Sequence, residues 1–277
     1  MTASFASDVL SLEIEAHVAT VWLDRPEARN ACGRAFWSDL PRACAAIAQA
    51  PDVRCVVLAA RGSHFTVGLD LKELGGSLTE EPAGASHAES SARSFEAVRA
   101  MQASVSALAK LAVPVIAAVH GYCIGAGVDL ISACDIRLCS EDAIFSVRET
   151  RMAIVADLGT LQRLPGIIGA GHVAELAFTG EDVDAARAER IGLVNAVHQG
   201  GAERVYAAAI ELARRISANS PLAVRGTKAV LAAAEARRIE EGLDFVARWN
   251  TMYLRSDDLS EAITAFLERR PPQFRGR

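Results

Sequence analysis

The stretch His120-Gly-Tyr-Cys-Ile-Gly-Ala-Gly-Val-Asp-Leu130 decides the fold. The apolar run before it, residues 113–119, is typical of a buried strand, and the glycines then turn the chain into a helix that begins near Ala126. A helix that starts directly after such a turn leaves backbone N–H groups unpaired at the positive end of its dipole. We therefore predict a site there for an anion, or for a carbonyl oxygen that becomes negative during a reaction.

A second stretch has the same organisation. The buried strand expected over residues 53–60 leads into Phe65-Thr-Val-Gly-Leu-Asp70, a turn that contains a glycine and precedes a helix. If the two strands are near neighbours, N–H groups from both turns can converge on one oxygen, which is the arrangement that stabilises an enolate. Asp129 follows the first turn closely, so its carboxylate is expected close to these N–H groups. N–H donors for a negative oxygen together with a nearby carboxylate predict an enzyme.

Strands and helices alternate around these two turns. Residues 75–93, rich in Gly, Ser, Glu and Ala, are expected to form a mobile loop. The periodicity predicts a hairpin over residues 9–15 and 17–23, helices over 34–50 and 94–111, short strands over 135–139, 143–147 and 191–197, and helices from 202 onward with a break near 219–221. This order predicts an α/β core over residues 1–200 and a helical C-terminal region over residues 201–277.

Composition excludes several classes of partner. The chain of 277 residues has a formal net charge of −5, so there is no basic excess to neutralise nucleic-acid phosphates. The longest apolar runs have the length of strands, which predicts no membrane span. The N-terminus lacks the basic and apolar regions of an export signal. We expect a cytoplasmic protein that binds neither nucleic acid nor membrane.

Cysteine and histidine give no sign of a metal site. The six cysteines lie in or beside apolar stretches and form no Cys-x-x-Cys pair, which is typical of small buried hydrophobic residues. His64 and His120 lie beside the two glycine turns, where a local hydrogen bond is the ordinary explanation. No cluster of histidine, cysteine and carboxylate has the spacing of metal ligands, so we predict no metal.

Five motifs lie in order along the chain: Arg25-Pro-Glu-Ala-Arg-Asn30, Phe65-Thr-Val-Gly-Leu-Asp70, Gly121-Tyr-Cys-Ile-Gly-Ala-Gly127, Cys134-Asp-Ile-Arg137 and Gly159-Thr-Leu-Gln-Arg-Leu164. With them the chain resembles the enoyl-CoA hydratase/isomerase (crotonase) superfamily over essentially its whole length. The resemblance implies a crotonase-like α/β fold, which is a spiral of ββα units with a C-terminal helical trimerisation region. It also implies a homo-oligomer, either a trimer or a dimer of trimers.

The same resemblance implies an acyl-CoA thioester substrate. No separate cofactor is expected, because coenzyme A is part of the substrate. The backbone N–H groups of Leu69 and Ala126 would hold the thioester oxygen. The residues expected along the substrate and coenzyme A binding path are Arg25, Ala28, Asn30, Val67, Asp70 and Gly125.

Three carboxylates are candidates for the chemistry: Asp129, Glu149 and Asp157. Hydratases of this superfamily place two glutamates at the positions of Asp129 and Glu149, and they usually carry glycine at the position of Asp157. This chain instead has Gly127-Val-Asp129, then Glu149, then Ala156-Asp-Leu-Gly-Thr-Leu-Gln-Arg-Leu164. In these positions it resembles the Delta(3,5)-Delta(2,4)-dienoyl-CoA isomerase subgroup.

That reaction needs two separated carboxylates. Moving a 3,5-diene into conjugation with the thioester requires removal of a proton near the carbonyl and delivery of a proton at the far end of the diene. Glu149 and Asp157 would form the pair, and Asp129 would position or electrostatically tune them. Burial in an apolar pocket would raise the pKa of a carboxyl that must take and release a proton. The sequence leaves open which of the two faces the carbon next to the thioester.

Each carboxylate also has an ordinary structural explanation. Asp129 is suited to complementing a helix N-terminus, and Asp157 is suited to capping the helix that follows it. Glu149 lies between Arg148 and Arg151, where a solvated ion cluster is possible. Arg151 also departs from the pattern of the subgroup. One hypothesis is that it changes which acyl chain the protein prefers.

Other functions remain open at this point. Within the superfamily, the alternatives are an enoyl-CoA hydratase that adds water to 2-trans-enoyl-CoA and a non-catalytic acyl-CoA-binding protein. Outside it, a dinucleotide-binding oxidoreductase would use a strand, a Gly-x-Gly turn and a helix, with an acidic residue about 20 positions on, which Glu149 nearly fits. Leu130 stands where that motif needs its third glycine, which disfavours the oxidoreductase.

Overall fold

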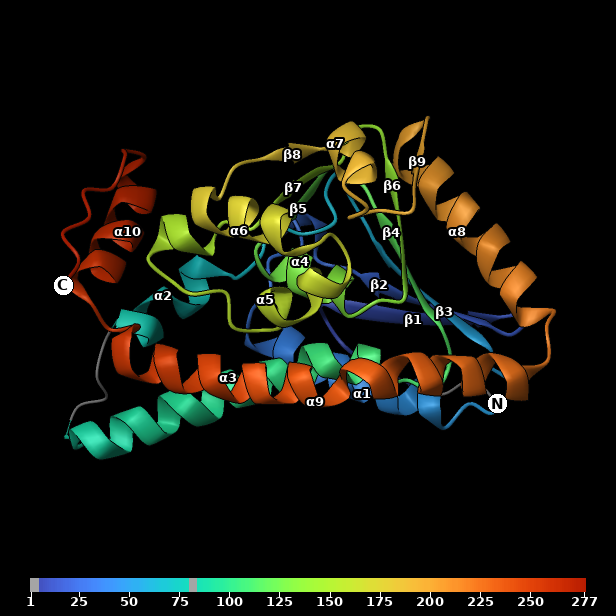
Figure 1. Cartoon of the computed structure of the whole chain (residues 1–277), viewed down its shortest axis with the longest axis horizontal. Helices are drawn as coiled ribbons and strands as arrows, with labels where there is room; N and C mark the ends of the chain where they lie inside the picture. Colours follow the sequence, from blue (N-terminus) through green and yellow to red (C-terminus); the bar gives the residue numbers. More distant parts are fainter. Residues whose placement is uncertain (1–4, 80–83) are drawn as a thin grey trace.

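The structure is a computed structural model that describes residues 5–79 and 84–277 of the chain (Figure 1). In this part of the chain, the larger of two sheets contains, in spatial order, β1 (Leu10–Glu15), β2 (Val18–Leu23), β3 (Cys55–Ala60), β4 (Val115–Val119), β6 (Ile136–Ser140) and β9 (Ala196–His198). β1 and β2 form the expected antiparallel hairpin, and every other pair of neighbours is parallel.

The smaller sheet begins inside the stretch that opened the sequence analysis. Its strands are β5 (Tyr122–Ile124), β7 (Ile144–Ser146) and β8 (Val183–Asp184). β5 pairs with β7 in parallel, and β7 pairs with β8 antiparallel. β5 follows β4 after only two residues, so the chain leaves the larger sheet at His120-Gly121 and enters the smaller one directly. The short strand β5 was not expected from the sequence.

Helices of very different length connect and cover the sheets. They are η1 (Pro26–Ala28), α1 (Arg34–Ala48), α2 (Leu71–Thr79), α3 (His87–Ala109), α4 (Ala126–Ser132), η2 (Glu149–Met152), α5 (Thr160–Arg163), η3 (Leu164–Gly166), α6 (Ala170–Thr179), α7 (Ala185–Arg190), α8 (Gly201–Ser217), α9 (Pro221–Tyr253) and α10 (Asp257–Glu268). Among the described residues, no helix has the length and apolar character needed to cross a membrane.

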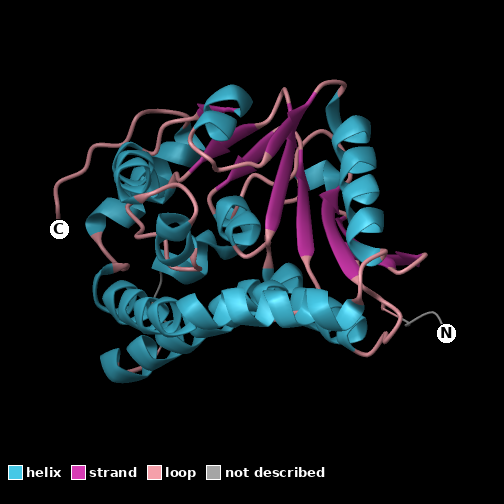
Figure 2. Ribbon diagram, turned by 45° about the vertical axis from the view of Figure 1, so that its right-hand side comes forward, coloured by secondary structure: helices cyan, strands magenta, loops and turns pink. Residues whose placement is uncertain are grey.

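The two faces of the larger sheet are covered by different helices. On one face lies α8, whose Val205 belongs to a buried cluster with Trp22 and Ile116 of the sheet (Figure 2). The opposite face carries the main core, to which α1 contributes Leu40 and α3 contributes Val105. Because β2, β3 and β4 are buried on both faces, their sequences are almost continuously apolar, as is usual for parallel strands.

The helices after residue 200 are built onto the α/β core. α9 runs beside α3 in both views, and near its start the ammonium group of Lys228 bonds the Val113 carbonyl at 2.9 Å and Asp135 at 2.7 Å (Figures 1 and 2). α10 packs against α2 and η2. The boundary expected at residue 200 falls at the N-cap of α8, and the division into two regions stays a prediction.

Two expectations for local structure were wrong. Of residues 75–93, expected to form a mobile loop, 75–79 belong to α2 and 87–93 to α3, while 80–83 lie outside the described residues. Ser86 and Glu89 form a capping box that starts α3, which the loop-like composition concealed. The strand expected over 191–197 is limited to β9, because the N–H groups of Leu193 and Val194 bond the Ala188 carbonyl of α7 instead of a neighbouring strand.

The close approach of the two glycine turns predicts the effect of a small substitution. Gly68 has a φ of +88°, and a β-carbon on it would lie 2.8 Å from the backbone carbonyl oxygen of Ile124. Gly68→Ala is therefore expected to lower the free energy of unfolding by about 1 kcal/mol or more, measured by denaturant titration. Gly171→Ala is the control, because residue 171 lies in α6 with open space around it. Equal stability of the two variants would contradict this account of the turn.

Candidate active site

Hydrogen bonds hold the two glycine turns together. β3 and β4 are paired neighbours, so both turns leave the same edge of the larger sheet. The N–H of Thr66 then donates to the Tyr122 carbonyl at 2.9 Å, and the N–H of Ile124 donates to the Thr66 carbonyl at 3.2 Å. As a result a β-carbon on Gly68 would lie 3.6 Å from the backbone nitrogen of Ala126. The turns are in contact.

The contact leaves two unpaired backbone donors beside each other. Ala126 is the first residue of α4, where N–H groups lack a partner within the helix, and Gly125 precedes it with a φ of +55°. On the other turn, the backbone N–H of Cys32 donates to the Gly68 carbonyl, and the Asp70 N–H donates to the Cys32 carbonyl. The N–H of Leu69, which lies between these two bonds, points away from Cys32. Within residues 5–79 and 84–277, neither the Leu69 nor the Ala126 N–H donates a hydrogen bond. Two free donors at this point suit an oxygen that becomes negative.

Asp129 is almost completely buried, with 1% of its surface exposed. Its Oδ1 accepts a hydrogen bond of 2.6 Å from the N–H of Thr160, the first residue of α5. The first N–H group of α5 is thus paired with Asp129, and not with Asp157, which was considered from the sequence as the cap of this helix. Burial raises the pKa of Asp129 to about 6, although the hydrogen bond from Thr160 and the positive charge of Arg163 oppose the shift.

Glu149, the first residue of η2, lies against the first glycine turn. A β-carbon on Gly125 would lie 3.4 Å from its Oε1. Its Oε2 is buried, and it has no hydrogen-bond partner among the described residues. Burial, together with the negative charges of Asp129 and Asp157, raises the pKa of Glu149 to about 8. A partly buried carboxyl that has one oxygen without a partner and lies close to like charges is typical of a reactive group.

The neighbouring arginines do not neutralise Glu149. Arg148 forms an ion pair with Asp182, and Arg151 donates from Nε to the Thr179 carbonyl at 3.1 Å. The Arg151 side chain packs on Gly180, so it is directed to the end of α6. The ion cluster considered from the sequence is thus absent from the described residues, and nothing in this placement connects Arg151 with an acyl chain.

Asp157 lies in the segment that leads into α5 and is held from the side of α9. Its Oδ2 accepts a hydrogen bond of 2.7 Å from Nδ2 of Asn250. Burial raises the pKa of Asp157 to about 7, the Asn250 hydrogen bond opposes the shift, and the charge of Asp129 adds to it. The structure therefore places Asp157, which is partly buried, within the electrostatic reach of the other two carboxylates.

Asn250 was missed by the sequence reasoning. It lies within α9 and is 2% exposed, and its Nδ2 bonds both Asp157 and the Val155 carbonyl. Asparagine is unfavourable within a helix, because its amide competes with the backbone for hydrogen bonds. The sequence signal for Asn250 was an asparagine within a long helical stretch, and this signal does not show which residue the amide bonds.

The residues predicted along the coenzyme A path also brace their own loops. Arg25 forms an ion pair of 2.7 Å with Asp70, and Asn30 bonds the carbonyl groups of Arg61 and His64, each at 2.9 Å. The N–H of Val67 donates to the Arg29 carbonyl at 3.2 Å, while Ala28 ends η1. These contacts hold the Arg25–Asn30 motif against the second glycine turn. Their role in binding a ligand stays a prediction.

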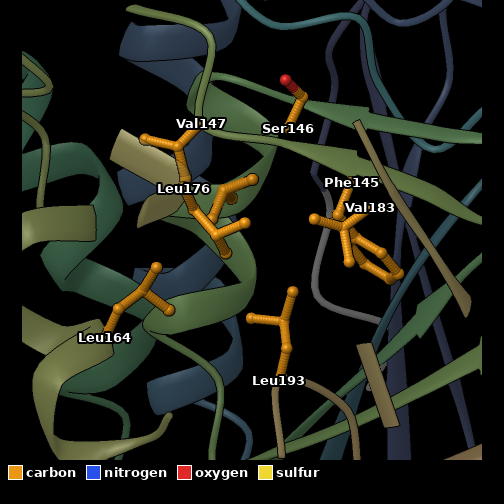
Figure 3. A pocket seen from close by; sticks show the side chains of 8 residues that line it. Phe145, Ser146, Val147, Leu164, Leu176, Val183 and Leu193 are labelled. Carbon is orange, nitrogen blue, oxygen red and sulfur yellow. The ribbon is translucent and has the colours of Figure 1, made fainter. Parts of the chain in front are cut away.

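A small apolar pocket lies beneath α4, but it contains none of the three carboxylates. Figure 3 shows the side chains around it, and the gap between them is too small for a water molecule. It is lined by Val128, Phe145, Ser146, Val147, Leu164, Leu176, Val183 and Leu193. We interpret it as an imperfection in core packing rather than as a site for an acyl chain.

The cysteines are buried free thiols, as the sequence indicated. Burial raises the pKa of Cys32, which lies next to the second glycine turn, to about 12, so its thiol is not a nucleophile at neutral pH. In the part of the chain that the structure describes, no group of three or more histidine, cysteine or carboxylate side chains has a metal-binding arrangement.

Comparison with known proteins agrees with the resemblance found in the sequence. The family model for enoyl-CoA hydratase/isomerase matches residues 13–277. The peroxisomal Delta(3,5)-Delta(2,4)-dienoyl-CoA isomerase of Arabidopsis thaliana is 42% identical over 96% of each chain. The mitochondrial protein of that name from Dictyostelium discoideum is 43% identical, over 93% of this chain and 87% of the relative. The resemblance to this subgroup is thereby confirmed.

Solved structures confirm the crotonase-like fold. An enoyl-CoA hydratase from Mycobacterium avium subsp. paratuberculosis K-10 has a TM-score of 0.84 at 26% identity and covers 98% of this chain and 100% of its own. The enoyl-CoA hydratase of Bacillus anthracis has a TM-score of 0.73 at 30% identity, with the same coverage.

These relatives correct the expected location of the protein and show its family. The cytoplasmic location expected from the sequence is wrong, because isomerases that are 41–43% identical to this chain are named peroxisomal in Arabidopsis thaliana and mitochondrial in Dictyostelium discoideum and Mus musculus. The fold, the paired glycine turns and the match over residues 13–277 all lead to one conclusion. The chain belongs to the enoyl-CoA hydratase/isomerase family.

Proposed function

We propose that this protein is an acyl-CoA isomerase that shifts 3,5-dienoyl-CoA to 2,4-dienoyl-CoA. The observation that carries the proposal is the partly buried carboxylate of Asp157, held within electrostatic reach of Glu149 and Asp129. Hydratases of this family usually have glycine at that position, so a third carboxylate there indicates a reaction with two separated proton transfers. Relatives of 40–43% identity that are named dienoyl-CoA isomerases support the same reaction.

The first step forms an extended enolate. A carboxylate removes a proton from carbon 2, and the electron pair of the broken C–H bond spreads over the thioester oxygen and the diene. The N–H groups of Leu69 and Ala126 are placed to stabilise that oxygen, and each such donor contributes about 3 kcal/mol to the transition state. They stabilise the enolate but do not move the proton, so the carboxylates must do so.

We assign carbon 2 to Glu149 and carbon 6 to Asp157. Glu149 lies against Gly125, next to the donor that would hold the thioester oxygen, and carbon 2 is one bond from the thioester carbon. Asp157 is tied instead to α9 and would protonate carbon 6, which completes the 2,4-diene. One C–H bond breaks and one forms. A proton must then pass from Glu149 to Asp157 before the next turnover.

The reaction requires a pair that carries one proton. One member must be ionised to accept a proton, and the other must be protonated to donate one. With pKa values of about 8 for Glu149 and about 7 for Asp157, the pair carries one proton near neutral pH. Because Glu149 has the higher pKa, this proton lies mainly on Glu149 and must pass to Asp157 before Glu149 can accept the proton of carbon 2. Asp129 contributes through its charge, which raises the pKa of Glu149 and so makes Glu149 a stronger base.

We also propose that the protein is a homo-oligomer. Large apolar side chains of the C-terminal helices are exposed in the single chain, which is typical of an interface between subunits. They are Leu222, Val230, Leu231, Phe245, Trp249, Met252 and Tyr253 of α9, and Phe266 and Leu267 of α10. A trimer or a dimer of trimers would cover these residues.

The first prediction concerns the reaction itself. The wild type is expected to convert 3,5-dienoyl-CoA to the conjugated 2,4-diene, seen as an increase in ultraviolet absorbance. Asp157→Asn and Glu149→Gln should each lower kcat by about 10²- to 10⁴-fold, because each removes one proton transfer, while binding of the CoA ester persists. Glu175→Gln, at an exposed carboxylate paired with Arg187, is the control and should retain activity. Rapid hydration of crotonyl-CoA that Asp157→Asn leaves unchanged would instead favour a hydratase.

The second prediction concerns stability. Because the pKa of Glu149 is raised from 4.5 to about 8, the unfolded chain releases this proton at lower pH than the folded one. The wild type therefore loses stability as pH rises from about 4.5 to 8. Glu149→Gln removes that loss, so its Tm should equal that of the wild type at pH 5 and exceed it at pH 8.5. A Tm difference that is the same at both pH values would argue against a buried, protonated Glu149.

The third prediction concerns assembly. Light scattering coupled to size exclusion is expected to give the mass of a trimer or hexamer, because exposed apolar surface on α9 and α10 drives association. The mass should hold over a tenfold dilution, as it does for subunits joined by large apolar interfaces. A stable monomer at micromolar concentration would contradict the proposal.

A further inference from the structure

The segment around Asp157 is clamped by two amide side chains from helices far apart in the sequence. Gln102 of α3 donates from Nε2 to the main-chain carbonyl of Asp157 at 2.7 Å and to the Leu243 carbonyl at 2.9 Å. Asn250 of α9 donates from Nδ2 to the Asp157 carboxylate at 2.7 Å and to the Val155 carbonyl at 2.9 Å. Both amides are 2% exposed. One clamp thus holds the backbone of Asp157, and the other holds its reactive group.

The orientation of the Asn250 amide follows from its partners. Nδ2 carries two hydrogens, and the carbonyl of Val155 can only accept. If the amide were turned over, its oxygen would lie 2.9 Å from the Val155 oxygen, and two acceptors would repel each other. The amide group facing Oδ2 of Asp157 is therefore a donor. Since a donor NH₂ group has no lone pair to accept a proton, Oδ2 must stay unprotonated in either charge state of Asp157.

We propose that Asn250 is a positioning residue of the isomerisation, which makes Oδ1 the oxygen of Asp157 that exchanges the proton with the substrate. The inference rests on the proposed function, because it presumes that Asp157 transfers a proton. Because Asn250 occupies Oδ2, the proton of Asp157 can lie only on Oδ1 and is transferred from that atom. The C-terminal helix α9 then contributes to the geometry of the reaction as well as to the stability of the fold.

A second consequence concerns the acidity of Asp157. A hydrogen bond donated to a carboxylate favours the ionised form, so Asn250 lowers the pKa of Asp157 against the effect of burial. On the elements packed around Asp157, the charged groups that act on it are Asp129 of α4 and Glu149 of η2. Arg163 of α5 acts on Asp129, and Arg99 of α3 is paired with Glu240 of α9. All of them are retained when Asn250 is replaced, so a change in acidity reports on the lost donor.

The pH dependence of kcat measures this acidity. The pair of Glu149 and Asp157 is active with one proton, so the rate should form a bell-shaped curve. The acidic limb of that curve reports the first proton lost, which comes mainly from the member of lower pKa, Asp157. Loss of the Asn250 donor should move this limb to higher pH, whichever carbon Asp157 serves.

The experiment compares three variants of the full-length protein on 3,5-dienoyl-CoA. Asn250→Leu has no donor and should move the acidic limb up by about 1 pH unit, toward the pKa of Glu149, and lower kcat at pH 7 about tenfold, with KM changed less than about threefold. Asn250→Ala also removes the donor without adding a charge, and it should move the limb the same way if the leucine variant does not fold. Gln102→Leu removes a bond to the backbone of Asp157, so its Tm should fall while the limb stays in place.

Each outcome decides the proposal. A shift of the acidic limb in the Asn250 variants alone supports it. An unmoved limb in the Asn250 variants, or an equal shift in Gln102→Leu, overturns it while the proposed function stands, provided that the wild type isomerises the diene. Absence of isomerisation by the wild type overturns both.

Discussion

The structure depends on the hydrogen bonds that join the second glycine turn to β5. Through the pairing of Thr66 with residues 122–124, two turns that are more than fifty residues apart are held as a single unit. Gly68 makes this contact possible, since any β-carbon there would collide with the Ile124 carbonyl. The free N–H groups of Leu69 and Ala126 become neighbours only because of this contact. A backbone amide that has no partner in the fold is then available to a substrate oxygen.

The electrostatics of the site follow from what surrounds these turns. Asp129, Glu149 and Asp157 come from α4, η2 and the segment before α5, and burial raises the pKa of each carboxyl. Their mutual repulsion is tolerated because Thr160 and Asn250 each donate a hydrogen bond to one of them, and Arg163 lies within reach of Asp129. A buried oxygen of Glu149 has no hydrogen-bond partner among the described residues. Such an unfavourable arrangement is typical of a site that is tuned for proton transfer at the expense of stability.

The helices of the C-terminal region reach into the site rather than merely covering the core. α9 lies beside α3 and supplies Asn250 to Asp157, while α10 packs against η2, which carries Glu149 (Figure 1). The apolar side chains that α9 exposes on its other surfaces are those we propose to lie between subunits. In this arrangement, subunit association and the geometry of the carboxylates share one helix, so a disturbance at the interface has a short path to Asp157.

The sequence by itself determined the two glycine turns and most of the order of the strands and helices, because glycine spacing and apolar periodicity are local properties of the chain. The three carboxylates were named through the resemblance to the family, and their catalytic roles stay a proposal. It misjudged residues 75–93, where a capping box made a helix of a segment with the composition of a loop, and it missed β5 and Asn250. Only the tertiary structure decided which carboxylate each donor serves. Thr160 bonds Asp129 across 31 residues and Asn250 bonds Asp157 across 93, and contacts of such separation leave no periodic trace in a sequence. The pKa of each carboxyl depends on burial and on neighbouring charges in space, so only the tertiary structure decides it.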